Sequence, residues 1–175
     1  TPGIRLAVYG NRRIDDALVE LGDLCAARGF RTLAAGSFVA PHTFSAKVGK
    51  GRPSEADLAA AADLGRRAAD KLSGAWEPPA LPGNRPYRDF QRAPFYPEGD
   101  GSCTGCGACA RACPGEAIDP AAPRETDGEK CIRCLACVHA CPTGSRRVEG
   151  AAFSATVAHL EEALTKTERP PELYL

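Results

Sequence analysis

Eight of the nine cysteines in this 175-residue chain lie between positions 103 and 141, and they form two sets with the same spacing. The first set reads Cys103-x2-Cys106-x2-Cys109-x3-Cys113-Pro114, and the second reads Cys131-x2-Cys134-x2-Cys137-x3-Cys141-Pro142. Each cysteine of the second set follows its counterpart in the first at the same interval, so the segment contains an internal duplication. The duplication predicts two similar halves related by a pseudo-two-fold axis, each with a ligand loop and a short helix.

The spacing of the cysteines suits iron–sulfur clusters, because a cubic [4Fe-4S] cluster needs one thiolate for each of its irons. Three cysteines at intervals of three residues can wrap around one end of the cube, and the fourth ligand must come from a distant segment. In runs of this type the fourth cysteine ligates the other cluster. The spacing therefore predicts one cluster on Cys103, Cys106, Cys109 and Cys141, and a second on Cys131, Cys134, Cys137 and Cys113.

Three other interpretations of the cysteines compete with this one. A disulfide framework requires an oxidising compartment, and nothing in the sequence indicates export. Paired zinc sites use pairs of cysteines separated by a longer gap, rather than triplets followed by a fourth cysteine before proline. A degraded site would have lost at least one ligand, whereas both sets are complete.

Composition and charge exclude several function classes. The 22 basic and 22 acidic side chains cancel, so the chain has no overall bias toward nucleic acid or anionic membranes. No apolar run approaches the ~20 residues of a membrane-spanning helix or resembles a signal peptide, which predicts a cytoplasmic protein. No Ser/His/Asp set, carboxylate pair or other catalytic cluster indicates a hydrolase or transferase.

The segments around the cysteines predict an α+β chain. Ile4–Tyr9 indicates a strand, a helix follows from Asp15 or Asp16 to Gly29, and Phe30–Val39 indicates a second strand with a break at Gly36. A second helix is expected from Pro53, and the order strand–helix–strand–helix predicts two parallel strands with two helices. The expected domains are 1–75, a proline-rich linker over 76–100, the cysteine domain over 101–150, and a C-terminal helix and tail over 151–175.

The segment 101–150 resembles a bacterial-type 2[4Fe-4S] ferredoxin. This resemblance implies one-electron transfer at low potential between redox partner proteins, which dock only transiently. Val8–Arg12, Gly51-Arg52-Pro53 and Pro82–Tyr87 extend the resemblance to the rest of the chain, which is similar to a ferredoxin fused behind a flavodoxin-like domain. Residues 1–75 would then be the C-terminal half of that domain, so that the chain starts in its middle.

The flavodoxin-like resemblance implies that Tyr9, Gly10, Asn11 and Arg12 face the ring of a bound FMN. The phosphate-binding loop that follows the first strand of such domains has no counterpart in this sequence, so FMN is expected only in an intact full-length protein. The leading hypothesis from these resemblances is therefore an electron-transfer protein without catalysis of its own, and the alternative is a flavin-linked iron–sulfur oxidoreductase. A third hypothesis is a sensing module in which loss of a cluster reports oxygen.

Overall fold

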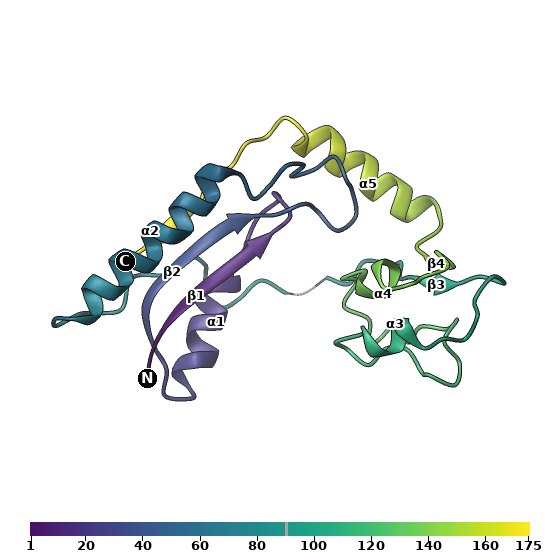
Figure 1. The fold of residues 1–175 in the computed structure, drawn as a ribbon, viewed down its shortest axis with the longest axis horizontal. Coiled ribbons are helices and arrows are strands. Elements are labelled where there is room, and N and C mark those ends of the chain that lie inside the picture. Colours follow the sequence, from purple (N-terminus) through teal and green to yellow (C-terminus); the bar gives the residue numbers. More distant parts are fainter. Residues whose placement is uncertain (90) are drawn as a thin grey trace. The chain divides into compact units, whose positions relative to one another are not determined.

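A computed structural model of the chain describes residues 1–89 and 91–175 (Figure 1). These residues divide into two units, and the first consists of Thr1–Asp89 together with Leu160–Leu175. In the sequence, the second unit comes between these two segments, and it includes all eight clustered cysteines. The segment 76–100, which was expected to be a linker, is thus divided between the units.

The first unit is built on a three-stranded sheet with the order β1-β2-β5. Strands β1 (Pro2–Tyr9) and β2 (Arg31–Val39) are parallel, as the two apolar runs predicted. The short strand β5 (Glu172–Tyr174) pairs with β2 in the antiparallel direction, and the sequence analysis missed it inside the expected C-terminal tail. Because β2 is the central strand, every one of its residues after Arg31 is buried.

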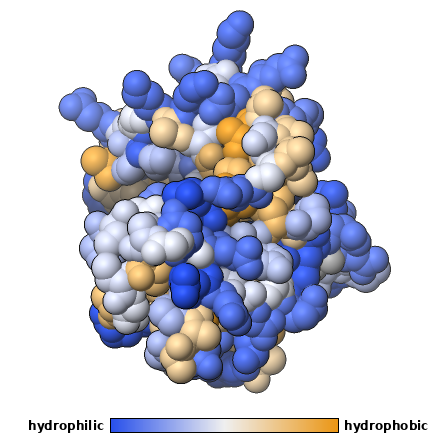
Figure 2. Space-filling model, turned by 90° about the vertical axis from the view of Figure 1, so that its right-hand side faces the viewer, coloured by the Kyte–Doolittle hydropathy of each residue, from blue (hydrophilic) through white to orange (hydrophobic). Residues whose placement is uncertain are grey.

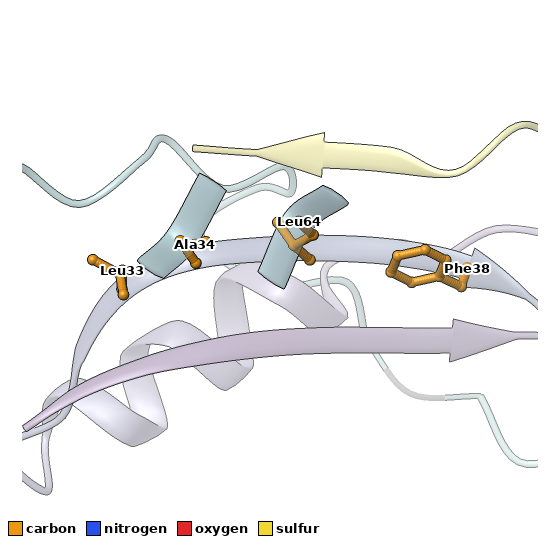
Figure 3. Packing of buried hydrophobic residues seen from close by; sticks show 5 residues of the cluster. Leu33, Ala34, Phe38 and Leu64 are labelled. Atoms are coloured by element: carbon orange, nitrogen blue, oxygen red, sulfur yellow. The ribbon is translucent and has the colours of Figure 1, made fainter. Parts of the chain in front are cut away.

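Helices α1 (Ala17–Ala26) and α2 (Glu55–Leu72) cover the sheet. The side chains of Leu33, Ala34 and Phe38 from β2 pack with Leu64 from α2 in the main core of this unit (Figure 3). The expected break at Gly36 is wrong, because β2 runs through this residue without interruption. A Cβ atom at Gly36 would lie 3.0 Å from Leu64 Cδ2, so the glycine permits the close approach of α2 rather than ending the strand.

The segment before residue 90 is attached to α1 by hydrogen bonds to two aspartates. The backbone N–H groups of Asn84 and Arg88 each donate to the Asp16 carboxylate at 2.8 Å. These hydrogen bonds hold the pKa of Asp16 below its usual range. Arg85 forms a bidentate ion pair with Asp23, at 2.7 and 2.8 Å. Residues 84–88 therefore form part of the first unit.

The second unit contains short elements separated by turns. Strands β3 (Glu98–Gly99) and β4 (Arg146–Arg147) pair in the antiparallel direction, and between them lie the helices α3 (Ala108–Arg111) and α4 (Ala136–His139). Helix α5 (Ala151–Leu164) begins in this unit, and its residues from Leu160 onward belong to the first. In the described part of the chain, no helix has both the length and the apolar character needed to span a membrane.

The chain is thus a mixed α and β protein with small sheets. Two parallel strands and two helices are present in the first unit, as expected. The closer likeness of this unit to a flavodoxin, and the pseudo-two-fold axis of the second unit, remain predictions.

Candidate metal centre

The duplication of the sequence is repeated in the backbone of the second unit. Helices α3 and α4 occupy equivalent positions of the repeat, since each begins one residue before the third cysteine of its set. Each follows a residue in the left-handed region, Gly107 with φ of 69° and Leu135 with φ of 58°. Two residues earlier, Gly105 and Arg133 also have positive φ, of 71° and 60°. Such alternation turns successive N–H groups toward one concavity, a geometry found at many anion and iron–sulfur sites.

The first predicted ligand set lines a single cavity. Cys103, Cys106 and Cys109 belong to the first half of the repeat, and Cys141 reaches the same cavity from the other half. Because Cys141 is the last cysteine of the second set, only the tertiary structure brings it to this triplet.

In the second predicted set, Cys131 and Cys113 both lie near Cys137. The thiol of Cys137 is close enough to Cys131 and Cys113 that their charges raise its pKa, although burial is the larger cause of the rise. Cys113 also packs against the buried cluster formed by Cys109, Ile118 and Cys137. The fourth member, Cys134, is exposed at the surface. The structure thus brings Cys113 near the triplet of the opposite half.

Backbone N–H groups and hydroxyls point at several of the sulfur atoms. The N–H of Ala117 donates to Cys113 Sγ at 3.2 Å, and the N–H of Arg133 donates to Cys131 Sγ at 3.4 Å. The hydroxyl oxygens of Ser145 and Thr143 lie 3.3 and 3.6 Å from Cys141 Sγ. The two hydroxyls are the largest cause that lowers the pKa of Cys141, to about 6. The lowered pKa favours the thiolate, which is the form that binds metal.

The arrangement fits a cluster better than a single ion. A tetrahedral zinc site draws its ligands in to ~2.3 Å from the metal, so the sulfur atoms must converge. Among residues 1–89 and 91–175, no three His, Cys, Asp or Glu side chains converge in a way that would hold one metal ion. Four thiols around a shared cavity instead provide one ligand for each iron of a cube, and the backbone N–H of Arg146, hydrogen-bonded to Cys141, is placed to stabilise added negative charge.

Of the four residues predicted to face FMN, Tyr9 ends β1, and Gly10, Asn11 and Arg12 lie in the turn that follows, where the side chains of Asn11 and Arg12 have other partners. Asn11 is only 3% exposed, and its Nδ2 donates to the carbonyl oxygens of Leu164 at 3.2 Å and Thr167 at 2.7 Å. Arg12 forms an ion pair with Asp15. The Asn11 amide therefore links this turn to the end of α5, and nothing in the structure supports a flavin contact there.

The turn also has little space at Gly10, another of the residues predicted to face FMN. A Cβ atom placed on Gly10 would come within 2.6 Å of the His42 ring, so the backbone is packed closely against that side chain. Burial raises the pKa of the neighbouring Tyr9. The contact of these residues with FMN remains a prediction.

The sequence analysis missed one residue of the site, Arg146. It lines the cavity of the first cysteine set and is 1% exposed. A signal for it was present in the repeat, because Arg146 follows Cys141 at the same interval at which Ile118 follows Cys113. A charged residue thus occupies the position of an apolar one.

Comparison with known proteins agrees with this geometry. Residues 102–145 match the family model described as a 4Fe-4S dicluster domain. No curated protein and no solved structure matches the chain. The family match covers both cysteine sets, and it supports a ferredoxin-like iron–sulfur domain with a role in electron transfer in this part of the chain.

Proposed function

We propose that the second unit holds two [4Fe-4S] clusters and that the chain passes single electrons between redox partner proteins. Cys103, Cys106, Cys109 and Cys141 would bind one cluster, and Cys131, Cys134, Cys137 and Cys113 the other. Each cluster supplies a site that accepts one electron from a reduced donor and returns it to an oxidised acceptor, without a bond being made or broken in the protein.

The observation that carries this proposal is the cavity shared by Cys141 and the first triplet. The proximity of Cys113 to Cys137 supports the corresponding arrangement at the second site, where Cys113 from the first set joins the second triplet. Together these contacts favour crossed ligation, in which each cluster ties one half of the repeat to the other. Such ties stabilise a small unit, because a unit of this size buries little apolar surface of its own.

The exposure of the cysteines supports exchange of electrons with another protein. The middle cysteine of each triplet, Cys106 or Cys134, is exposed, whereas the third, Cys109 or Cys137, is buried. Each site would thus have one corner at the surface while its other side is shielded from water. An electron carrier requires such an exposed edge and needs no substrate pocket.

The surface character fits brief docking. Ile132, beside Cys131, is 60% exposed and offers an apolar contact close to the second site. The face drawn in Figure 2 is mainly hydrophilic, with apolar residues in small patches. Weak redox encounters use small interfaces of this kind, whereas permanent assemblies bury larger and more apolar surfaces.

Metal analysis and electron transfer test the proposal. Protein reconstituted with iron and sulfide without oxygen should contain about eight irons and eight sulfides per chain, and dithionite should produce the paramagnetic signal of reduced clusters. The reduced protein should then deliver about two electrons per chain to oxidised cytochrome c. Bound zinc without iron would overturn the cluster assignment, and clusters that failed to reduce cytochrome c would favour the sensing module.

A further inference from the structure

The two halves of the repeat differ at one buried position beside the cysteines. Ile118 in the first half is 5% exposed and packs with Cys109 and Cys137. Its equivalent in the second half is Arg146, which is 1% exposed and is the largest fully buried side chain of the described residues. A charged guanidinium therefore occupies the place where the repeat otherwise has a hydrocarbon.

The hydrogen bonds of Arg146 satisfy only part of its side chain. Its Nη2 donates to the Pro97 carbonyl at 2.8 Å, and the carbonyl of Pro123 and the hydroxyl of Thr126 accept further hydrogen bonds. All of these acceptors are neutral. Its buried Nε has no hydrogen-bond partner within residues 1–89 and 91–175, and no carboxylate of these residues forms an ion pair with Arg146.

Cysteines, which can carry negative charge as thiolates, lie near Arg146. Arg146 lines the cavity that Cys141 shares with the first triplet. Strand β4, which contains Arg146, also packs against α4, which contains Cys137 of the second triplet. The guanidinium therefore lies beside thiols from both predicted ligand sets.

A buried charge without a counter-charge is strongly unfavourable, and it persists in folded proteins when it is paired. The thiols around Arg146 become thiolates once they bind metal, and reduction adds one more negative charge. We propose that Arg146 is the buried counter-charge of the two cluster sites and that it raises their reduction potential. This inference rests on the proposed function and goes beyond it, since it names a residue that tunes the clusters without ligating them.

The positive charge of Arg146 would raise the reduction potential because it interacts more favourably with a reduced cluster than with an oxidised one. In the reaction, one electron moves from an external reductant to the cluster, and no covalent bond changes. Because Arg146 is buried, its charge is screened much less by solvent and salt than that of a surface arginine. The neighbouring Arg147, which is half exposed and pairs with Asp100 and Glu149, provides the matched control.

A redox titration followed by electron paramagnetic resonance tests this inference. The variants are Arg146→Gln, Arg146→Ile, Arg146→Lys and the control Arg147→Gln, each reconstituted without oxygen. Arg146→Ile introduces the residue that the first half carries at this position. We expect Arg146→Gln and Arg146→Ile to lower the midpoint potential of at least one cluster by about 59 mV, a tenfold change in the equilibrium for adding one electron. Arg147→Gln should shift it less than half as much.

The outcomes separate this inference from the proposed function. A wild-type protein that binds no cluster would contradict the proposed function itself. Clusters that form in Arg146→Gln or Arg146→Ile with unchanged potentials would overturn only the role of Arg146. If neither variant assembles clusters, Arg146→Lys decides the question. A potential near that of the wild type supports the charge, whereas a lowered potential or a failure to assemble shows that Arg146 acts through its hydrogen bonds.

Discussion

Crossed ligation can be tested by removing cysteines in pairs. In the proposed arrangement Cys113 and Cys134 serve the same cluster, although they belong to different halves of the sequence repeat. Cys113→Ala alone should remove one cluster and lower the iron content from about eight to about four per chain. The double variant Cys113→Ala/Cys134→Ala should retain those remaining irons, because both substitutions affect one cluster. Cys113→Ala/Cys106→Ala should lose nearly all iron, because each substitution affects a different cluster.

The same variants should weaken the second unit by a predictable amount. Through its cluster, Cys113 would be joined to Cys131 across a loop that includes the turns between the two halves. In the chain-entropy treatment, a cross-link over a loop of about 20 residues stabilises the folded state by ~3 kcal/mol. We therefore expect Cys113→Ala to make the second unit markedly more sensitive to trypsin, which cleaves after Arg124 and Lys130 in that loop.

Iron and sulfide analysis after anaerobic reconstitution gives the decisive numbers, and timed proteolysis gives the stability. Cys25→Ala is the matched control, because Cys25 lies on α1 in the first unit and should leave the iron content unchanged. Uncrossed ligation predicts the reverse pattern: Cys113→Ala/Cys106→Ala would keep one cluster, and Cys113→Ala/Cys134→Ala would lose both. That result would refute the reasoning from the shared cavity.

Two further predictions concern the first unit, whose unfolding can be followed through Trp76, the single tryptophan, which packs against its main core. The first concerns Asp57, which is 1% exposed, and whose pKa is held at about 2 by Arg52 and Ser54. Since this pKa is below its usual 3.8, the ionised carboxylate stabilises the folded state above about pH 4, and this contribution disappears as the pH falls toward 2. The stability difference between wild type and Asp57→Asn in urea should therefore shrink by ~2 kcal/mol between pH 7 and pH 2, and an equal difference at every pH would contradict this explanation. The second is that Asn11→Ala should lower the free energy of unfolding by about 1–3 kcal/mol, because the partly buried Thr167 carbonyl loses this donor and the Leu164 carbonyl keeps only the N–H of Thr167. An exposed substitution in the same turn, Arg13→Ala, serves as its control, and equal stability of the two variants would show that these hydrogen bonds contribute little.

Local patterns predicted the regular elements of the first unit well. The apolar runs around Leu6 and Leu33 correspond to β1 and β2, and helical periodicity identified α1 and α2. The prediction failed at Gly36, because the local tendency of glycine to interrupt a strand was outweighed by packing against Leu64. Strand β5 was missed because three residues carry little periodicity, and it forms only where β2 presents a free edge.

The sequence by itself determined which atoms can bind metal at this site, since eight thiols at fixed intervals and the duplication of their pattern are properties of the chain alone. The short helices and left-handed turns that present these thiols also follow from local sequence, because they are repeated wherever the spacing is repeated. The spacing also predicted that Cys141 would meet the first triplet, but it gave no reason for a charged side chain at the site, and only the tertiary structure decided that Arg146 is buried beside these thiols. The physical reason is that spacing constrains near neighbours, whereas the approach of distant segments depends on which surfaces are buried together when the whole chain folds.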